Sequence, residues 1–325
     1  MIQFVENHPK LRGFSKYYSV NIHPQLEQKE PKRLRIVRRE RAIRFLGILI
    51  GLLGVSIMIT LKNLELALGF GLLFCVSLFS FVFNWGFYSL SYVKTETKNI
   101  IMMGVCRFLG WEYSEIMIES EHLDSILEMG LLPQPFDRIN FEDRMTGTID
   151  GMDFDAYEVE LQRCDDKKTK RSWTKIFEGQ ILAFKITNKF QGQTLVIRDK
   201  GAFNKKRIGA LKRVGLVDPV FEKIFEAYGT DQVEARYLLT PVFMQKLVDL
   251  EHAVNGKDIR FAFNNGYLLI VIDTKNQYSA GPMFKPLTDA GRTQKILDEI
   301  GAIYDVIDGV VKPNKTNQTS VLLSI

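Results

Sequence analysis

The sequence contains few of the residues on which recognisable catalytic and metal chemistry depends. Its 325 residues include four histidines and three cysteines. The histidines form no HExxH motif, and Cys75, Cys106 and Cys164 have no CxxC spacing, so neither a zinc site nor a disulfide framework is predicted. A phosphate-binding GxxxxGK[ST] loop is also absent. We therefore predict no catalytic residue, no metal and no cofactor.

A large excess of charge is missing as well. The formal net charge is only +5, whereas a nucleic-acid-binding domain is usually strongly basic on one face, so no nucleic-acid partner is expected. Much of the basic excess lies in the leader before residue 45, which includes Lys29, Lys32, Arg33, Arg35, Arg38, Arg39, Arg41 and Arg44.

Two long apolar runs follow this basic leader, over residues 45–61 and 66–90, and neither contains a charged residue. As helices they would cover roughly 25 Å and more than 30 Å, close to the thickness of a bilayer core. They predict a transmembrane helical hairpin over residues 45–92. Because Lys and Arg stay on the cytoplasmic side, both termini are expected to be cytoplasmic, and the protein is expected to be a multi-pass protein of the bacterial inner membrane.

The remaining chain has the pattern of a cytoplasmic α+β domain over residues 93–325, preceded by the polar and basic leader over residues 1–44. Residues 93–130 predict a helical neck, with Ser120 as a cap and Gly130 as a stop. Later segments alternate with period two, and helical segments are segregated from them. The expected fold is a transmembrane hairpin, a helical neck and a mostly antiparallel sheet with packed helices.

Several local signals locate the strands and helices of this domain. Asp150-Gly151 and Asn264-Asn265-Gly266 predict hairpin turns, and the continuously apolar YLLIVID segment predicts a central strand. The charged stretch from Asp165 to Arg171 is typical of a loop. Gly179 suggests a bulge or bend. A last helix is expected over residues 288–310.

A second basic cluster is a candidate surface for anionic lipid. Its members are Lys205, Lys206, Arg207, Lys212 and Arg213. An ordinary solvated face is the alternative explanation, and topology alone would also explain the basic leader.

A candidate ligand site is formed by Asp231, Glu234 and Arg236. The spacing from Asp231 to Glu234 is also that of a helix capping box with Asp at the cap. Helix capping and surface ion pairing are therefore the competing explanation for these charges.

Three segments carry a family resemblance: DPVFEKIFEAYGTDQVEARYLLTP, FEGQILAFKITNKFQGQTLVIRD and FAFNNGYLLIVI. In these segments the chain resembles an uncharacterised bacterial family, a domain of unknown function, over about residues 35–310. The resemblance implies a two-span inner-membrane protein with a C-terminal cytoplasmic domain. It supplies no catalytic residues.

The functional hypothesis from these observations is a membrane-anchored cytoplasmic interaction or scaffolding module. Its expected partners are the lipid bilayer and either a protein partner or a second copy of the chain. Two alternatives remain open: a membrane-tethered hydrolase or transferase acting on an envelope-related substrate through Asp231, Glu234 and Arg236, and a sensor of anionic lipid headgroups.

Overall fold

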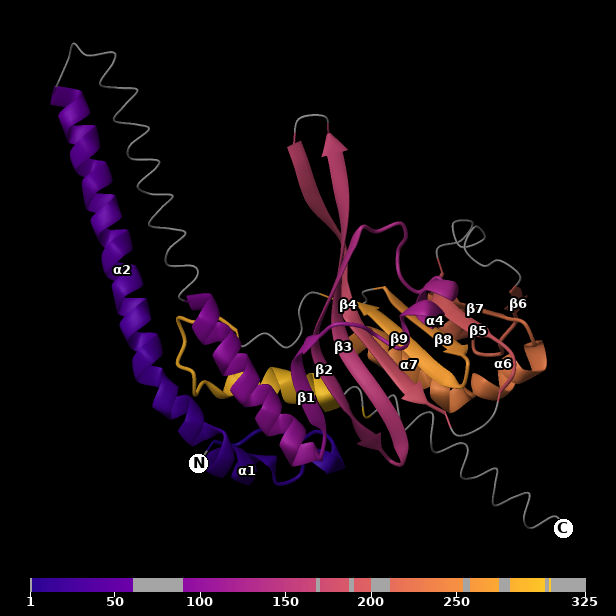
Figure 1. Ribbon diagram of the computed structural model, residues 1–325. Coiled ribbons are helices and arrows are strands. Elements are labelled where there is room, and N and C mark those ends of the chain that lie inside the picture. The colour runs from indigo at the N-terminus through magenta and orange to yellow at the C-terminus, as the bar shows by residue number, and fades with distance from the viewer. Residues whose placement is uncertain are drawn as a thin grey trace. The chain divides into compact units, whose positions relative to one another are not determined.

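The computed structural model describes residues 2–60, 90–167, 170–186, 190–199, 211–253, 258–274, 281–301 and 304. The chain divides into two compact units (Figure 1). Unit 1 comprises Met1–Val5, Gly13–Gly104 and Ser279–Gln294, and unit 2 comprises Glu6–Arg12, Val105–Tyr278 and Lys295–Ile325. The domain boundaries predicted at residues 44 and 92 stay predictions.

Unit 2 is built on an antiparallel sheet, and its described residues form nine strands in the order β1-β2-β3-β4-β9-β8-β5-β7-β6. Adjacent strands pair antiparallel throughout. The strands are β1 (Glu112–Met117), β2 (Arg138–Ile149), β3 (Met152–Lys167), β4 (Lys170–Lys185), β5 (Thr194–Arg198), β6 (Lys212–Val214), β7 (Phe225–Gly229), β8 (Ile259–Asn264) and β9 (Tyr267–Asp273). The predicted antiparallel sheet is therefore present, and the apolar strand β9 is central as expected.

Two hairpin turns fix the register of this sheet as the sequence predicts. Between β2 and β3, Asp150 and Gly151 have φ values of 49° and 87°. Between β8 and β9, Asn265 and Gly266 have φ values of 50° and 81°. Such positive values are required at both central residues of a type I′ turn, which matches the twist of the two strands it joins.

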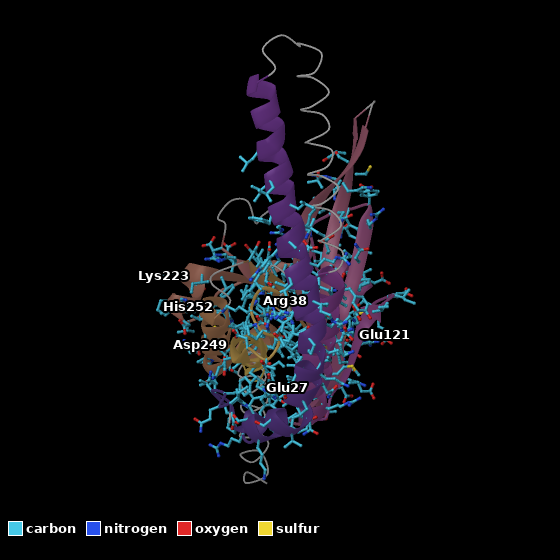
Figure 2. The ribbon with its side chains drawn as sticks, turned by 90° about the vertical axis from the view of Figure 1, so that its left-hand side faces the viewer. Glu27, Arg38, Glu121, Lys223, Asp249 and His252 are labelled. Carbon is cyan, nitrogen blue, oxygen red and sulfur yellow. The ribbon has the colours of Figure 1, made fainter. Side chains whose placement is uncertain are left out.

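Both faces of the sheet are covered by apolar packing. On one face, the short helix α4 (Leu123–Glu128) contributes Ile126 to a core that includes Tyr157 and Val159 of β3. On the other face, α5 (Pro219–Ile224) and α7 (Pro241–Ala253) contribute buried Phe rings. These rings pack edge-on or tilted against rings of β7 and β8. On the outer side of the two helices, Lys223, Asp249 and His252 point away from the sheet (Figure 2).

The helical neck predicted over residues 93–130 is wrong in its second half. A helix covers residues 90–109, but β1 (Glu112–Met117) follows and joins the sheet edge, and only α4 is helical thereafter. Ser120 does not cap α4, since the N-cap residue is His122. Pairing of β1 with β2 overrides the local helical pattern, because the strand gains backbone hydrogen bonds along its length.

Unit 1 contains α1 (Phe14–Asn21), α2 (His23–Thr60), most of the helix over residues 90–109, and residues 279–294. Basic residues of the leader make protein contacts here. Arg33, only 3% exposed, donates to the backbone carbonyl of Met283 and pairs with Glu30. Lys29 and Lys32 both pair with Glu96. Part of the positive charge that suggested a membrane topology thus neutralises carboxylates inside the protein.

The predicted transmembrane hairpin is wrong on the structural finding, because no helix within the described residues is both long enough and apolar enough to cross a membrane. In α2, the described side chains beyond Arg44 are those of residues 45–49, 51 and 52. Almost all of the second predicted span, 66–90, lies outside the described residues.

The same finding overturns the predicted multi-pass location in the bacterial inner membrane, with both termini cytoplasmic. The transmembrane anchor that followed from it is likewise unsupported. Pro31 lies inside α2, where a proline removes one backbone hydrogen bond of the helix.

Candidate functional site: a projecting ribbon and its acidic base

The predicted ligand residues lie at the start of helix α6 (Gln232–Leu238), where they make local contacts. Asp231 is the N-cap, and its carboxylate accepts hydrogen bonds from the backbone N–H groups of Val233 and Glu234. The carboxylate of Glu234 turns toward another segment and accepts from the N–H groups of Gln191 and Gly192, at 2.8 and 2.7 Å. Glu234 thereby fastens the loop before β5 to α6.

Arg236 lies on the same helix and donates to the backbone carbonyl of Gly215 at 3.2 Å. Each of these side chains thus has a partner within its own neighbourhood, and the capping role of Asp231 is confirmed. Their role as a ligand site stays a prediction.

The predicted basic cluster is only partly described. Lys212 and Arg213 belong to the edge strand β6, and Arg213 lies 4.0 Å from the carboxylate of Glu226 on β7. Lys205, Lys206 and Arg207 lie outside the described residues. The anionic-lipid role of this cluster stays untested.

A buried polar cluster that the sequence did not reveal connects the segment before α4 to β3. The guanidinium of Arg144 donates two hydrogen bonds, of 2.9 and 3.0 Å, to the Asp155 carboxylate. His122 Nε2 lies 3.9 Å from Asp155 Oδ2, and the Ser120 hydroxyl is hydrogen-bonded to that of Tyr157. Burial lowers the pKa of His122 and raises that of Tyr157, so both groups are held neutral.

This Ser, His and Asp set differs from a nucleophilic triad. In a triad the imidazole accepts a proton from the serine hydroxyl. Here, within the described part of the chain, the side-chain partner of Ser120 is Tyr157, and only the backbone N–H of His122 reaches the serine oxygen, at 3.2 Å. The arrangement ties the 120–122 segment to the sheet.

The far ends of β3 and β4 form a two-stranded ribbon. The last paired residue of β2 is Arg138, opposite Gln162, and the last paired residue of β9 is Asp273, opposite Gly179. Beyond those points the two strands pair only with each other among the described residues, from Gln162 opposite Lys175 to Lys167 opposite Lys170. Figure 1 shows this part projecting past the rest of the sheet. We call residues 162–167 and 170–175 the ribbon.

The stretch from Asp165 to Arg171 was expected to be a loop, and that expectation is wrong for its described residues 165–167 and 170–171, which belong to strands. A two-stranded ribbon that packs no apolar face against a core has no alternation of apolar and polar residues. The charged sequence therefore gave no strand pattern to detect. Trp173 was the available signal, since aromatic residues favour strands.

Contacts at the base hold the ribbon in place. The guanidinium of Arg138 lies over the Trp173 ring, 4.0 Å from its centroid. The Asp137 carboxylate accepts from the backbone N–H of Cys164 at 2.7 Å. Trp173 is nevertheless 44% exposed. The ring is therefore fixed in position while much of its surface faces solvent.

An acidic hollow lies on the sheet at the foot of the ribbon. It is a cavity of about 120 Å³ lined by Asn140, Glu142, Glu158, Val159, Glu160, Glu178, Gly179 and Thr274. Glu142 stands directly opposite Glu158, and Glu160 directly opposite Glu178. Like charges placed opposite one another across two strands destabilise a sheet.

One ribbon lysine offsets part of this repulsion. Lys175 Nζ lies 2.5 Å from Glu160 and 2.9 Å from Glu178. These hydrogen-bonded carboxylates raise the pKa of Lys175. The hollow is thus a place where a cation supplied by a ribbon is favourable.

Residues 175–311 match the family described as "Protein of unknown function (DUF3137)". The chain contains a DUF3137 domain. The resemblance to an uncharacterised family is therefore confirmed, although its two-span membrane part is not supported. The DUF3137 domain begins at Lys175, so it includes that lysine and Glu178 of the hollow, while the rest of the ribbon precedes it.

Two other comparisons complete the picture around the DUF3137 domain. Among solved structures, the chain is similar to the mycobacterial trehalose monomycolate transport factor A, TtfA, with 10% sequence identity and a TM-score of 0.32. The match covers 66% of this chain and 96% of that chain, and at this score it carries no argument about function. None of the curated proteins matches the chain.

Proposed function

We propose that this protein is a non-catalytic interaction module that contacts a protein partner through the ribbon. The observation that carries the proposal is Trp173, a large aromatic side chain fixed beneath Arg138 yet 44% exposed at the base of a projecting hairpin. Rigid, half-exposed aromatic residues are frequent anchors of protein interfaces, because they bury a large area at low cost in side-chain entropy.

The length of the ribbon supports the same proposal. A two-stranded hairpin is only marginally stable in water unless a third strand or a packed helix supports it. This ribbon nevertheless continues for several residues beyond β2 and β9. A partner that packs against it would supply the missing support.

Charge gives the ribbon a preference among partners. In the sequence, residues 162–175 contain six basic residues, Arg163, Lys167, Lys168, Lys170, Arg171 and Lys175, and two acidic residues, Asp165 and Asp166. A segment with this excess of positive charge attracts an acidic protein surface over long range and disfavours a basic one.

The test compares Trp173→Ala with Tyr237→Ala in the full chain. Tyr237 is 53% exposed on α6, away from the ribbon, and is the matched control for loss of an exposed ring. In a strain that depends on the protein, Trp173→Ala should abolish function at unchanged abundance and unchanged unfolding midpoint, whereas Tyr237→Ala should remain functional. Full function of the Trp173 variant would overturn the proposal.

A further inference from the structure

We infer that strand β1, at one edge of the sheet, binds an extended basic segment of a partner protein, which pairs with it as an additional strand. The inference goes beyond the proposed function, because it concerns a different surface from the ribbon. Figure 1 shows β1 at one end of the sheet and β6 at the other. In the part of the chain that the structure describes, each of these two strands has a neighbouring strand on one side only.

The two edges differ in the features that discourage an added strand. The β6 edge is only three residues long, and two of its residues, Lys212 and Arg213, are basic. Short length and basic side chains are common means by which proteins prevent other strands from pairing with an edge. The β1 edge is six residues long and contains neither proline nor a basic residue. It therefore lacks both forms of protection, and its backbone is suited to pairing with an extended peptide.

The side chains of β1 alternate between a buried face and an open face. Met117 belongs to the apolar core together with Phe141, the residue directly opposite it on β2. On the open face, Ile116 is 76% exposed, and Ile118, which directly follows the strand, is 93% exposed. Side chains of neighbouring strands that point to the same face stand side by side. Alternate residues of an added strand would therefore cover these two isoleucines.

Charge indicates which kind of segment fits this edge. Residues 112–121 contain four glutamates and no lysine or arginine. Two of these glutamates, Glu112 and Glu119, are exposed and flank the isoleucine pair in the sequence. Ile116 also stands directly opposite Glu142 of β2, which lines the acidic hollow. An added strand thus meets negative charge beside the apolar contact, so a segment that alternates basic and aliphatic residues complements the edge.

The same charges disfavour a second copy of this chain as the partner. Pairing two β1 edges would bring the glutamates of both copies together, and like charges on neighbouring strands destabilise a sheet. The β6 edge of another copy has the complementary charge, but it spans three residues against the six of β1. A segment of a different protein can match both the length and the charge of β1.

The test uses synthetic peptides as probes and the full chain as the receptor. The first peptide alternates lysine with valine over the length of β1 and is blocked at both ends. Its affinity, measured by calorimetry, should fall as salt rises, because salt screens the attraction between exposed charges. A second peptide with glutamate in place of lysine should not bind. A third peptide keeps the lysines but is N-methylated on the backbone nitrogens that would face β1, so it cannot donate strand hydrogen bonds and should not bind either.

A variant of the receptor assigns the binding to the β1 edge. The chain that carries both Ile116→Lys and Ile118→Lys should bind the lysine peptide about tenfold more weakly or worse, because it loses the apolar contact and gains two repelling charges. Val217→Lys is the matched control, since Val217 is 96% exposed in the loop between β6 and α5, and it should bind like the parent. Both variants should keep the unfolding midpoint of the parent, because the replaced side chains are exposed.

Hydrogen exchange gives a second measurement that needs no substitution. The lysine peptide should slow the exchange of backbone amide hydrogens in residues 112–117, because an added strand protects them. Exchange in residues 212–214 of β6 should stay unchanged, because the basic side chains of that edge repel the peptide. Protection of β6 instead of β1 would contradict the inference.

The remaining outcomes also decide the matter. A parent chain that does not bind the lysine peptide, or that binds the glutamate peptide equally well, overturns the inference. Equal binding of the N-methylated peptide reduces the contact to charge attraction and overturns strand addition. Self-association of the parent that the isoleucine variant abolishes would assign the edge to a second copy and would likewise overturn it. The ribbon is tested separately through Trp173→Ala, so either proposal can fail while the other stands.

Discussion

Replacing Glu299 by Gln should stabilise the protein, by an amount that grows with pH. Glu299 lies on the helix that begins at residue 290, and its side chain is 19% exposed. Its Oε2 atom is buried without a hydrogen-bond partner. Burial raises the pKa of Glu299 from 4.5 to about 8, and the nearby Glu158 adds to the increase, while Lys295 opposes it.

The sign follows from the protons bound in each state. Because the folded pKa is above the unfolded one, the protonated acid stabilises the fold fully below pH 4.5, and this contribution is lost as pH rises through 8. Between these values each pH unit costs about 1.4 kcal/mol, which gives about 3 kcal/mol at pH 7. Residual exposure reduces this to about 2 kcal/mol, since water screens part of the penalty.

Glutamine keeps the shape of the protonated acid and does not ionise. Chemical unfolding of the full chain at pH 4.5, 7 and 8.5 should therefore show a midpoint equal to that of the parent at the lowest pH and increasingly higher above it. Glu119→Gln, which removes an exposed carboxylate, is the matched control and should change little. A Glu299→Gln variant that is no more stable than the parent at pH 8.5 would refute the reasoning.

Three further predictions concern single residues of unit 2. Gly179→Ala should destabilise the sheet by several kcal/mol, because a Cβ there would overlap the Ile272 carbonyl of β9. A denaturant titration measures this loss, and a cost under about 1 kcal/mol would contradict the steric argument. Glu234→Gln should lower the unfolding free energy by about 1–2 kcal/mol, since one of the two charge-assisted hydrogen bonds of Glu234 is weakened. Cellular function should survive if the residue only holds the loop before β5 in place. Burial lowers the pKa of His122, so the stability that the neutral imidazole contributes above pH 6.5 should be lost as pH falls below that value. His122→Gln should flatten this part of the profile of unfolding free energy against pH. Parallel profiles for the variant and the parent would contradict the prediction.

Local sequence patterns were sufficient where the conformation depends only on residues that are neighbours in the chain. The turns at Asp150-Gly151 and Asn265-Gly266 need residues that tolerate positive φ, and the Asp231 cap needs only the next three residues. These predictions are confirmed because each involves neighbours in sequence.

Long-range pairing explains where prediction failed. Strand β1 replaces part of the predicted neck because its backbone is hydrogen-bonded to β2. The ribbon replaces the predicted loop because the far ends of β3 and β4 are hydrogen-bonded to each other. Gly179 was expected to mark a bulge, whereas the register shift of β3 and β4 falls between Leu161 and Gln162. The glycine is needed instead for the close approach of β9, a strand about 90 residues later.

By itself, the sequence determined the hairpin turns, the helix cap, the central apolar strand and the resemblance to an uncharacterised family, whose domain is found at residues 175–311. Only the tertiary structure decided that Arg33 is a buried packing residue and that four glutamates gather at the foot of a basic ribbon. The reason is physical. Turns and caps depend on the torsion angles of adjacent residues, whereas a charged surface depends on which distant strands align, and that register is set by packing of the whole sheet.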